Sequence, residues 1–166
     1  DTALMVACRS GSVEVLHLLL AHGADIHAVN ADGESTLHVA VRNDHIAVAA
    51  VLLQRGVDVR CRGPRGVTAL HDAATRCAVD MCRLLLAHKA AVDACDQNGR
   101  TPLHAAASHG HMAVCKFLLE VGADMEWTDK RYRSVLLTAA HYNRLLVCQL
   151  LLERGANVLH ADKVGF

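Results

Sequence analysis

Residues 99–107 read Gly-Arg-Thr-Pro-Leu-His-Ala-Ala-Ala. The threonine and proline predict a helix start, because a threonine side chain caps the first turn and proline, which lacks an N–H, fits the first helical position. The alanine-rich run continues the helix, and Gly110 predicts its end, because glycine adopts the left-handed conformation at little cost. A second helix is predicted from about Met112 to Glu120, and Gly122 ends it in the same way.

The same pattern returns every 33 residues along the whole chain. Each copy begins with a serine or threonine: Thr2, Ser35, Thr68, Thr101 and Ser134. Two residues later stands a leucine, and an alanine follows three residues after that leucine. The second helix of each copy carries three large apolar residues: 18–20, 51–53, 84–86, 117–119 and 150–152. Five agreements at one period cannot be chance, so five repeats are predicted: 2–34, 35–67, 68–100, 101–133 and 134–166.

Helices of about nine residues are too short to be stable alone, so each must bury its apolar side against neighbours and the stable object is a stack. The motif at 99–104 resembles the signature of the ankyrin-repeat family, with weaker copies at 33–38 and 66–71. The resemblance covers the whole chain. It implies an all-α solenoid forming one domain, 1–166, in which antiparallel helix pairs carry projecting β-hairpin loops. It also implies partner binding along a concave face of hairpin tips and first helices.

Composition narrows the classes of function. The 17 basic and 17 acidic residues give a net charge of zero, which argues against a nucleic-acid binder or a polybasic membrane surface. No apolar stretch reaches the roughly 18 residues that a membrane helix needs. We therefore expect a monomer whose partner is a protein, with no nucleic acid and no membrane.

Seven cysteines include three at one phase of the repeat, Cys82, Cys115 and Cys148. Packed helices lie roughly 8–10 Å apart, beyond the roughly 7 Å between Cα atoms that a disulfide spans. These thiols are therefore predicted to be buried, unpaired and used as small apolar residues. Unpaired thiols indicate a reducing compartment, so a cytoplasmic or nuclear location is expected.

Some repeats depart from the pattern. Cys77 and Lys89 replace the glycines that should end the two helices of the third repeat, which costs on the order of 1 kcal/mol at each left-handed position. Tyr132 replaces the glycine that precedes the fifth repeat, and Leu137 replaces the motif histidine within that repeat. Terminal repeats normally have a polar outer face, whereas both ends here are apolar, so we expect a piece of a longer array.

The first candidate site is the loop that contains Trp127, the only tryptophan. The other repeats have smaller residues at this position, and Tyr132 follows among three cations. Tryptophan, tyrosine and arginine are enriched in the residues that dominate protein interfaces. The alternative is that Trp127 packs on the neighbouring hairpin and the cations are only solvated.

A second candidate is the row of polar residues on the first helices and hairpins, including Arg42, Glu34 and Arg65. Its central and C-terminal part is cationic, which would steer a partner segment with acidic and apolar residues. Alternatively, these charges only keep the stack soluble. The residues predicted to bind a partner are Arg76, Arg100, His109, Trp127, Lys130, Arg131, Tyr132, Arg133, His141 and Tyr142.

Metal and catalytic sites are not predicted. Zinc needs about four converging ligands, and neither CxxC nor HExxH occurs among the twelve histidines and seven cysteines. The family resemblance implies that the rings of the motif histidines (His38, His71 and His104 here) form hydrogen bonds with neighbouring backbone groups. Asp72 lies beside His71, but adjacent helical residues point apart. No nucleophile motif occurs, so we expect no enzyme and no cofactor. A protein-recognition module is the first hypothesis, and a spacer or autoinhibitory arm of a larger protein is the alternative.

Overall fold

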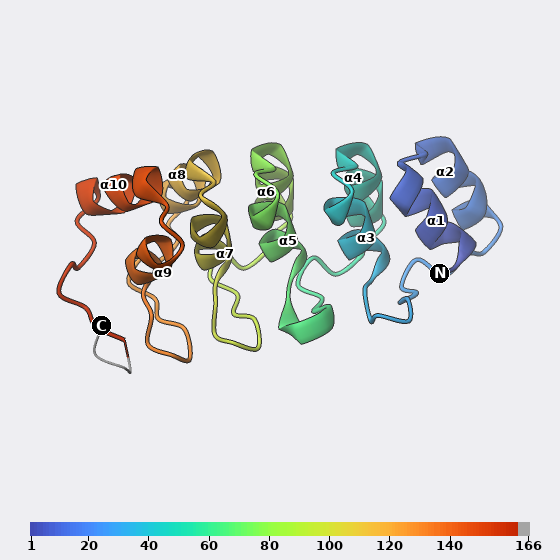
Figure 1. The fold of residues 1–166 in the computed structure, drawn as a ribbon. Coiled ribbons are helices and arrows are strands. Elements are labelled where there is room, and N and C mark those ends of the chain that lie inside the picture. The colour runs from blue at the N-terminus through green and yellow to red at the C-terminus, as the bar shows by residue number, and fades with distance from the viewer. Residues whose placement is uncertain (163–166) are drawn as a thin grey trace. The chain divides into compact units, whose positions relative to one another are not determined.

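The computed structural model describes residues 1–162, and these residues contain ten α-helices in five consecutive pairs (Figure 1). The helices are α1 (Ala3–Ser10), α2 (Val13–Ala21), α3 (Thr36–Arg42), α4 (Ile46–Gln54), α5 (Ala69–Thr75), α6 (Val79–Ala87), α7 (Pro102–His109), α8 (Met112–Glu120), α9 (Val135–His141) and α10 (Leu145–Glu153). A short 3-10 helix, η1 (Pro64–Gly66), lies between α4 and α5. The predicted all-α class is confirmed. Residues 163–166 of the predicted fifth repeat lie outside the described part.

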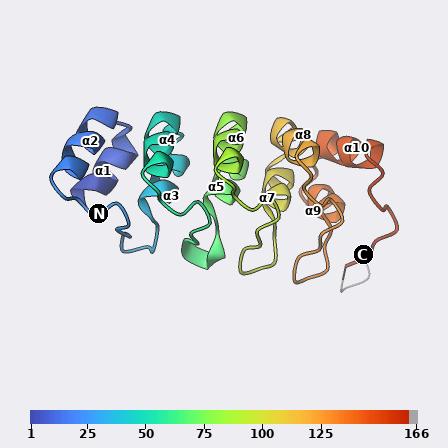
Figure 2. The same cartoon turned by 180° about the vertical axis from the view of Figure 1, so that it is seen from behind.

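The chain divides into two compact units. Unit 1 comprises Asp1–Ala73 and Asp80–Ala90, and unit 2 comprises Ala74–Val79 and the chain from Ala91 onward. In each unit the loops that join one helix pair to the next project to the same side of the helices, as both views show (Figures 1 and 2). Strand pairing within 1–162 is limited to two isolated bridges at hairpin bases, Val29 with Ser35 and Arg62 with Thr68. The prediction of one domain stays a prediction.

The predicted capping residues begin the first helices. The side-chain oxygens of Thr2, Ser35 and Ser134 accept hydrogen bonds from backbone N–H groups three residues on, at 3.3, 3.4 and 3.3 Å. Thr101 does the same for His104 at 3.4 Å, and its own N–H donates to Nδ1 of the His104 ring at 3.3 Å. In α7 the side chains of Thr101 and His104 therefore each accept a hydrogen bond from the backbone N–H of the other residue, which forms a capping box.

Two motif histidines join successive repeats, as the family resemblance implies. The Nε2 atom of His38 donates to the carbonyl oxygen of Val67 at 3.1 Å, and that of His104 donates to the carbonyl oxygen of Arg133 at 3.2 Å. Because a carbonyl oxygen only accepts, Nε2 carries the proton in both rings. Burial is the main cause that lowers the pKa of each ring, so both are neutral near pH 7.

A second set of links, which the sequence analysis did not identify, joins the start of a second helix to the preceding helix pair. The Nε2 atoms of His45 and His111 lie 2.9 Å from the carbonyl oxygens of Arg9 and Thr75. Arg144 takes the same place in the last pair, where its Nε donates to a carbonyl oxygen on α7 at 2.9 Å. These bonds satisfy carbonyl groups at the ends of first helices.

The cysteines form no disulfide among residues 1–162. Cys82 and Cys115 are buried, as predicted. Cys148 is only half-buried, so the prediction of burial is wrong there. It lies on α10, the last described helix, which contacts only α8 and α9 among the principal helix contacts and has no later described helix pair to cover it.

Three residues that replace a glycine of the repeat pattern have left-handed backbone. Cys77, Lys89 and Tyr132 have φ angles of 61°, 67° and 62°, so they keep the conformation of the glycines at equivalent positions, such as Gly11, Gly23 and Gly33. Arg65 also has a positive φ, of 58°, and it does not occupy a glycine position of the repeat. That residue lies at the tip of a hairpin loop, within η1.

Candidate functional site

The loop that carries Trp127 is organised by a carboxylate, that of Asp129. Its Oδ1 atom accepts hydrogen bonds from the backbone N–H groups of Arg131 at 2.8 Å and Arg133 at 3.0 Å. Its Oδ2 atom accepts two more from the Arg133 side chain, and Arg100 Nε lies 3.7 Å away from the same oxygen. The Asp129 side chain is 1% exposed, so the turn is closed around a buried anion.

Burial raises the pKa of the Asp129 carboxyl, but the hydrogen bonds from Arg133 and Arg131 outweigh burial and hold that pKa below its ordinary range. The group is therefore ionised near neutral pH. Arg133 is itself only 8% exposed. The expectation of an exposed cation is thus wrong for Arg133, because its guanidinium is committed to Asp129 inside the loop.

Several other residues of the loop are exposed to solvent. Lys130 and Arg131 are exposed, Tyr132 is 51% exposed and Trp127 is 38% exposed. Trp127 is therefore partly covered and partly accessible to solvent. Both alternatives from the sequence, packing on the neighbouring hairpin and contact with a partner, therefore stay predictions.

Other predicted residues lie at the far ends of the first helices. His141 and Tyr142 are exposed, and their rings meet edge to face with centroids 4.9 Å apart. His109 is exposed and stacks on His111 with ring centroids 5.7 Å apart. It also lines a cavity of about 220 Å³ together with Leu145 and Leu146. Arg76 is exposed, beyond the end of α5.

The predicted site thus separates into two groups in unit 2. One group surrounds the loop 124–134 and includes Arg100, just before α7. The other, with His109, lies at the opposite end of α7, whose eight residues span about 12 Å. The loop group holds the exposed tryptophan and two exposed cations, so it is the better candidate for a contact surface.

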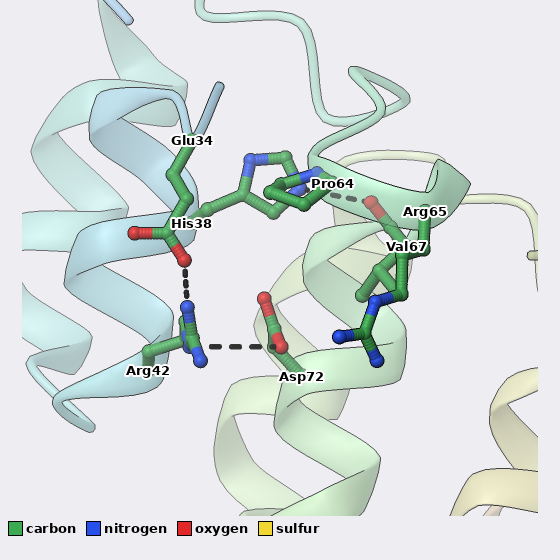
Figure 3. Close-up of a pocket in the computed structure, with 7 residues that line it drawn as sticks. All are labelled: Glu34, His38, Arg42, Pro64, Arg65, Val67 and Asp72. Atoms are coloured by element: carbon green, nitrogen blue, oxygen red, sulfur yellow. Dashed lines mark hydrogen bonds and ion pairs between the residues drawn. The ribbon is translucent and has the colours of Figure 1, made fainter. Parts of the chain in front are cut away.

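Sequence reasoning missed a cavity of about 240 Å³ in unit 1 (Figure 3). Arg42, Arg65 and Glu34 appear in the predicted row of charges, but the repeat pattern did not predict that they line one cavity. The cavity depends on the path of the hairpin that contains η1, which brings Arg65 over α5. The local sign of a different turn is Pro64, one of only two prolines, but a proline alone does not predict the cavity.

No three histidine, cysteine, aspartate or glutamate side chains converge as metal ligands within residues 1–162. None of the helices in that range is long and apolar enough to cross a bilayer.

The chain matches a protein-family model. The family model for ankyrin repeats matches residues 1–63 and 70–162, in three copies. The match covers nearly all of the described chain, whereas the count of five repeats stays a prediction from the spacing. A comparison with curated proteins finds no match.

Proposed function

The chain belongs to the ankyrin-repeat family, and we propose that it binds a partner protein through the loop 124–134 and the exposed residues around it. Ankyrin repeats are generally protein-interaction modules and are typically not enzymes. The observation that carries the proposal is the partly exposed Trp127 beside exposed Lys130, Arg131 and Tyr132. Aromatic and arginine side chains supply most of the residues that dominate binding energy at interfaces.

The loop 124–134 already has a fixed backbone conformation in the unbound protein. Asp129 fixes the turn through four hydrogen bonds, two to backbone and two to Arg133, so little backbone freedom is lost on binding. Trp127 lies two residues before this anchor. A covered indole with one accessible part loses little side-chain entropy in a complex, which supports its role as an apolar anchor.

The exposed charges favour a partner segment with acidic and apolar residues. Lys130 and Arg131 are solvent-exposed cations, which mainly accelerate encounter with an acidic partner and are screened by salt. Trp127 and Tyr132 would be covered in the complex, so they mainly slow dissociation. We extend the proposal to a monomeric protein in the cytoplasm or nucleus.

The proposal is tested by capture of partner proteins on the immobilised chain, followed by affinity measurements on the best-retained partner. Trp127→Ala should cost roughly 2 kcal/mol of binding free energy, the usual threshold for a dominant interface residue. Arg131→Ala should cost less and should reduce the dependence of the association rate on salt. Lys116→Ala, an exposed change on α8, is the matched control and should leave both unchanged.

The melting temperature of each variant is measured in parallel. If Trp127→Ala lowers the melting temperature and leaves the affinity intact, the tryptophan only packs and the proposed site is wrong. Retention of no specific partner would instead favour the spacer or autoinhibitory arm.

A further inference from the structure

We propose that the cavity in unit 1 binds the carboxylate of one aspartate or glutamate side chain of a partner protein, through Arg65 and Arg42 (Figure 3). This inference rests on the proposed function as a protein-binding module, but it concerns residues outside the loop 124–134. It adds a second contact and names the chemistry that the contact recognises.

The floor of the cavity is a histidine that cannot itself take a ligand. His38 is 1% exposed, and both ring nitrogens are used. Nε2 donates to the carbonyl oxygen of Val67 at 3.1 Å, and Nδ1 lies 2.8 Å from the hydroxyl oxygen of Ser35. Because both ring nitrogens of His38 are engaged by protein atoms, the ring forms the floor of the cavity and leaves ligand binding to other side chains.

The two carboxylates of the cavity already have partners. Glu34 is buried, its Oε2 atom accepts from the side-chain amide of Asn30 at 3.0 Å, and its Oε1 atom is paired with Arg42. Asp72 lies 4.0 Å from Nε of Arg42, on the other side of the same guanidinium. Figure 3 shows Arg42 between these two carboxylates. A cation from a partner would have to displace Arg42 to reach them.

Arg42 is held in place and still accessible. Its side chain is 49% exposed although two carboxylates fix its guanidinium. A guanidinium has five N–H donors, and the two ion pairs use only some of them. The remaining donors can bind a further acceptor without reorganisation of the side chain.

Arg65 supplies a cation that has no ion-pair contact among residues 1–162. It is exposed at the rim of the cavity, and among residues 1–162 its side chain makes no hydrogen bond or ion pair. Its φ angle of 58° is unfavourable for a side chain larger than glycine. Backbone strain of this kind is concentrated at functional sites, where it positions a side chain.

The hairpin that presents Arg65 differs from the others for a local reason. In three other hairpins a side-chain oxygen caps the turn, from Asn30, Asp96 or Asp129. The equivalent residue here is Gly63, where an added Cβ would lie 3.1 Å from Nε2 of His38. The loop therefore turns through Pro64–Gly66 instead, and this turn brings Arg65 to the cavity (Figure 3).

Charge and size select the ligand. The two arginines and two carboxylates of the lining balance in number, but both carboxylates lie against Arg42 and Arg65 has no ion pair. The group left without a counterion contact is therefore the Arg65 cation, and a ligand carboxylate fits beside it. The volume of about 240 Å³ is below the roughly 300–1,000 Å³ of small-molecule sites, so it suits a single side chain. Arginine and carboxylate pair through two parallel N–H···O bonds, which gives both strength and orientation.

The test uses phage-displayed random linear peptides selected on the full chain, and affinity measurements with synthetic peptides from the selection. Arg65→Gly removes the guanidinium at a backbone conformation that glycine prefers, so the variant keeps its fold. Arg55→Ala, an exposed arginine of unit 1 outside the cavity, is the matched control. Each peptide is also made with its acidic residues replaced by the corresponding amides.

We expect selected peptides to contain an acidic residue whose amide form binds roughly ten-fold more weakly or worse, as for loss of a charge-assisted hydrogen bond. Arg65→Gly should weaken the acidic peptide by a similar factor and leave the amide form unaffected, and Arg55→Ala should change neither. The proposal is overturned if no selected peptide depends on Arg65, or if the Arg65-dependent peptides require a basic residue instead.

Trp127→Ala separates this proposal from the proposed function of the loop 124–134. Peptides that lose affinity on Trp127→Ala but not on Arg65→Gly overturn the cavity and leave the loop in place. Acidic peptides that lose affinity on Arg65→Gly but not on Trp127→Ala support the cavity and count against the loop.

Discussion

The guanidinium of Arg133 donates two hydrogen bonds to one oxygen of Asp129, from Nε at 3.1 Å and from Nη2 at 2.7 Å. The two side chains are 9% and 1% exposed, so the ion pair is almost completely shielded from water. Loss of one member of such a pair leaves a buried charge without its counterion, which costs far more than loss of an exposed pair. The pair therefore decides whether the loop 124–134 keeps its shape.

Asp129→Ala should lower the free energy of unfolding by about 3 kcal/mol, because it leaves Arg133 unpaired and removes the side-chain acceptor of two backbone N–H groups. Urea denaturation measures the change. Lys130→Ala, an exposed neighbour, serves as control and should change stability by less than about 0.5 kcal/mol. A loss as small for Asp129→Ala as for the control would show that the loop does not depend on this pair.

The buried motif histidines should make the protein less stable in mild acid. Burial lowers the pKa of His38 and His104 from the ordinary value of 6.5, so the unfolded chain binds protons that the folded chain does not. The contribution of these two histidines to the free energy of unfolding is therefore fully present above pH 6.5 and falls as the pH drops below 6.5. Urea denaturation at several pH values measures the effect, and His104→Gln should reduce the slope.

The Asp129 carboxylate loses its contribution to the free energy of unfolding at a lower pH than the histidines do. The pKa of Asp129 is lowered from 3.8, so its contribution is present above that pH and is lost only as the pH falls further, through the folded value. A decline confined to the acid side of pH 3.8 would therefore implicate carboxylates such as Asp129 and not the buried histidines. NMR titration of the His104 ring gives an independent answer, and a pKa at or above 6.5 would contradict burial as the dominant effect.

The helices were predictable because their signals are local and repeated. Thr101 and Pro102 mark the start of α7, and α8 runs from Met112 to Glu120 as predicted. The loop at Trp127 stood out in the sequence because it holds the only tryptophan, and its role in binding stays a prediction.

The burial of Arg133 was not predicted, because its charge suggested a solvent-facing residue. A signal existed in the sequence, since Asn30, Asp96 and Asp129 recur at hairpin positions of the repeat, where each caps a turn. The cavity of unit 1 had no such signal. It depends on a contact between residues far apart in sequence, His38 and Val67, and on a backbone conformation that side-chain type alone does not predict.

The thiols should differ widely in reactivity. Burial, with a smaller contribution from Cys77, raises the pKa of Cys115 to about 12, and burial raises that of Cys8 to about 11. Cys77 is exposed. Since the thiolate is the nucleophile, iodoacetamide near pH 8 should alkylate Cys77 first and should reach Cys8 and Cys115 only on unfolding.

Mass spectrometry after timed alkylation measures the order, and the urea-unfolded protein is the control in which all sites should react. Equal rates for Cys77 and Cys115 in the folded protein would contradict the burial. A disulfide among Cys82, Cys115 and Cys148 in the unreduced protein would contradict the prediction from their spacing.

Lys89 adopts a φ angle of 67° at the place where the equivalent residues of the other repeats are Gly23, Gly56, Gly122 and Gly155. A side chain in this conformation costs roughly 1–2 kcal/mol, from which the greater freedom of glycine in the unfolded chain subtracts roughly 0.5–1 kcal/mol. Lys89→Gly should therefore raise the free energy of unfolding by about 0.5–1 kcal/mol. Its backbone carbonyl would still accept the hydrogen bond from Arg60 Nε, now 3.2 Å long, because the substitution leaves the backbone in place.

Two further variants show whether the conformation itself is the cause. Gly56→Lys should lower stability by about 1 kcal/mol, and the effect would be conformational alone, because an added Cβ there meets nothing within 4 Å. Lys116→Gly, in the middle of α8, should also lower it by about 1 kcal/mol, because glycine disfavours a helix interior. A glycine that stabilises at position 89 and destabilises at 116 thus identifies left-handed backbone as the source of the gain. If Lys89→Gly lowers stability as Lys116→Gly does, the φ angle of Lys89 carries no strain in solution.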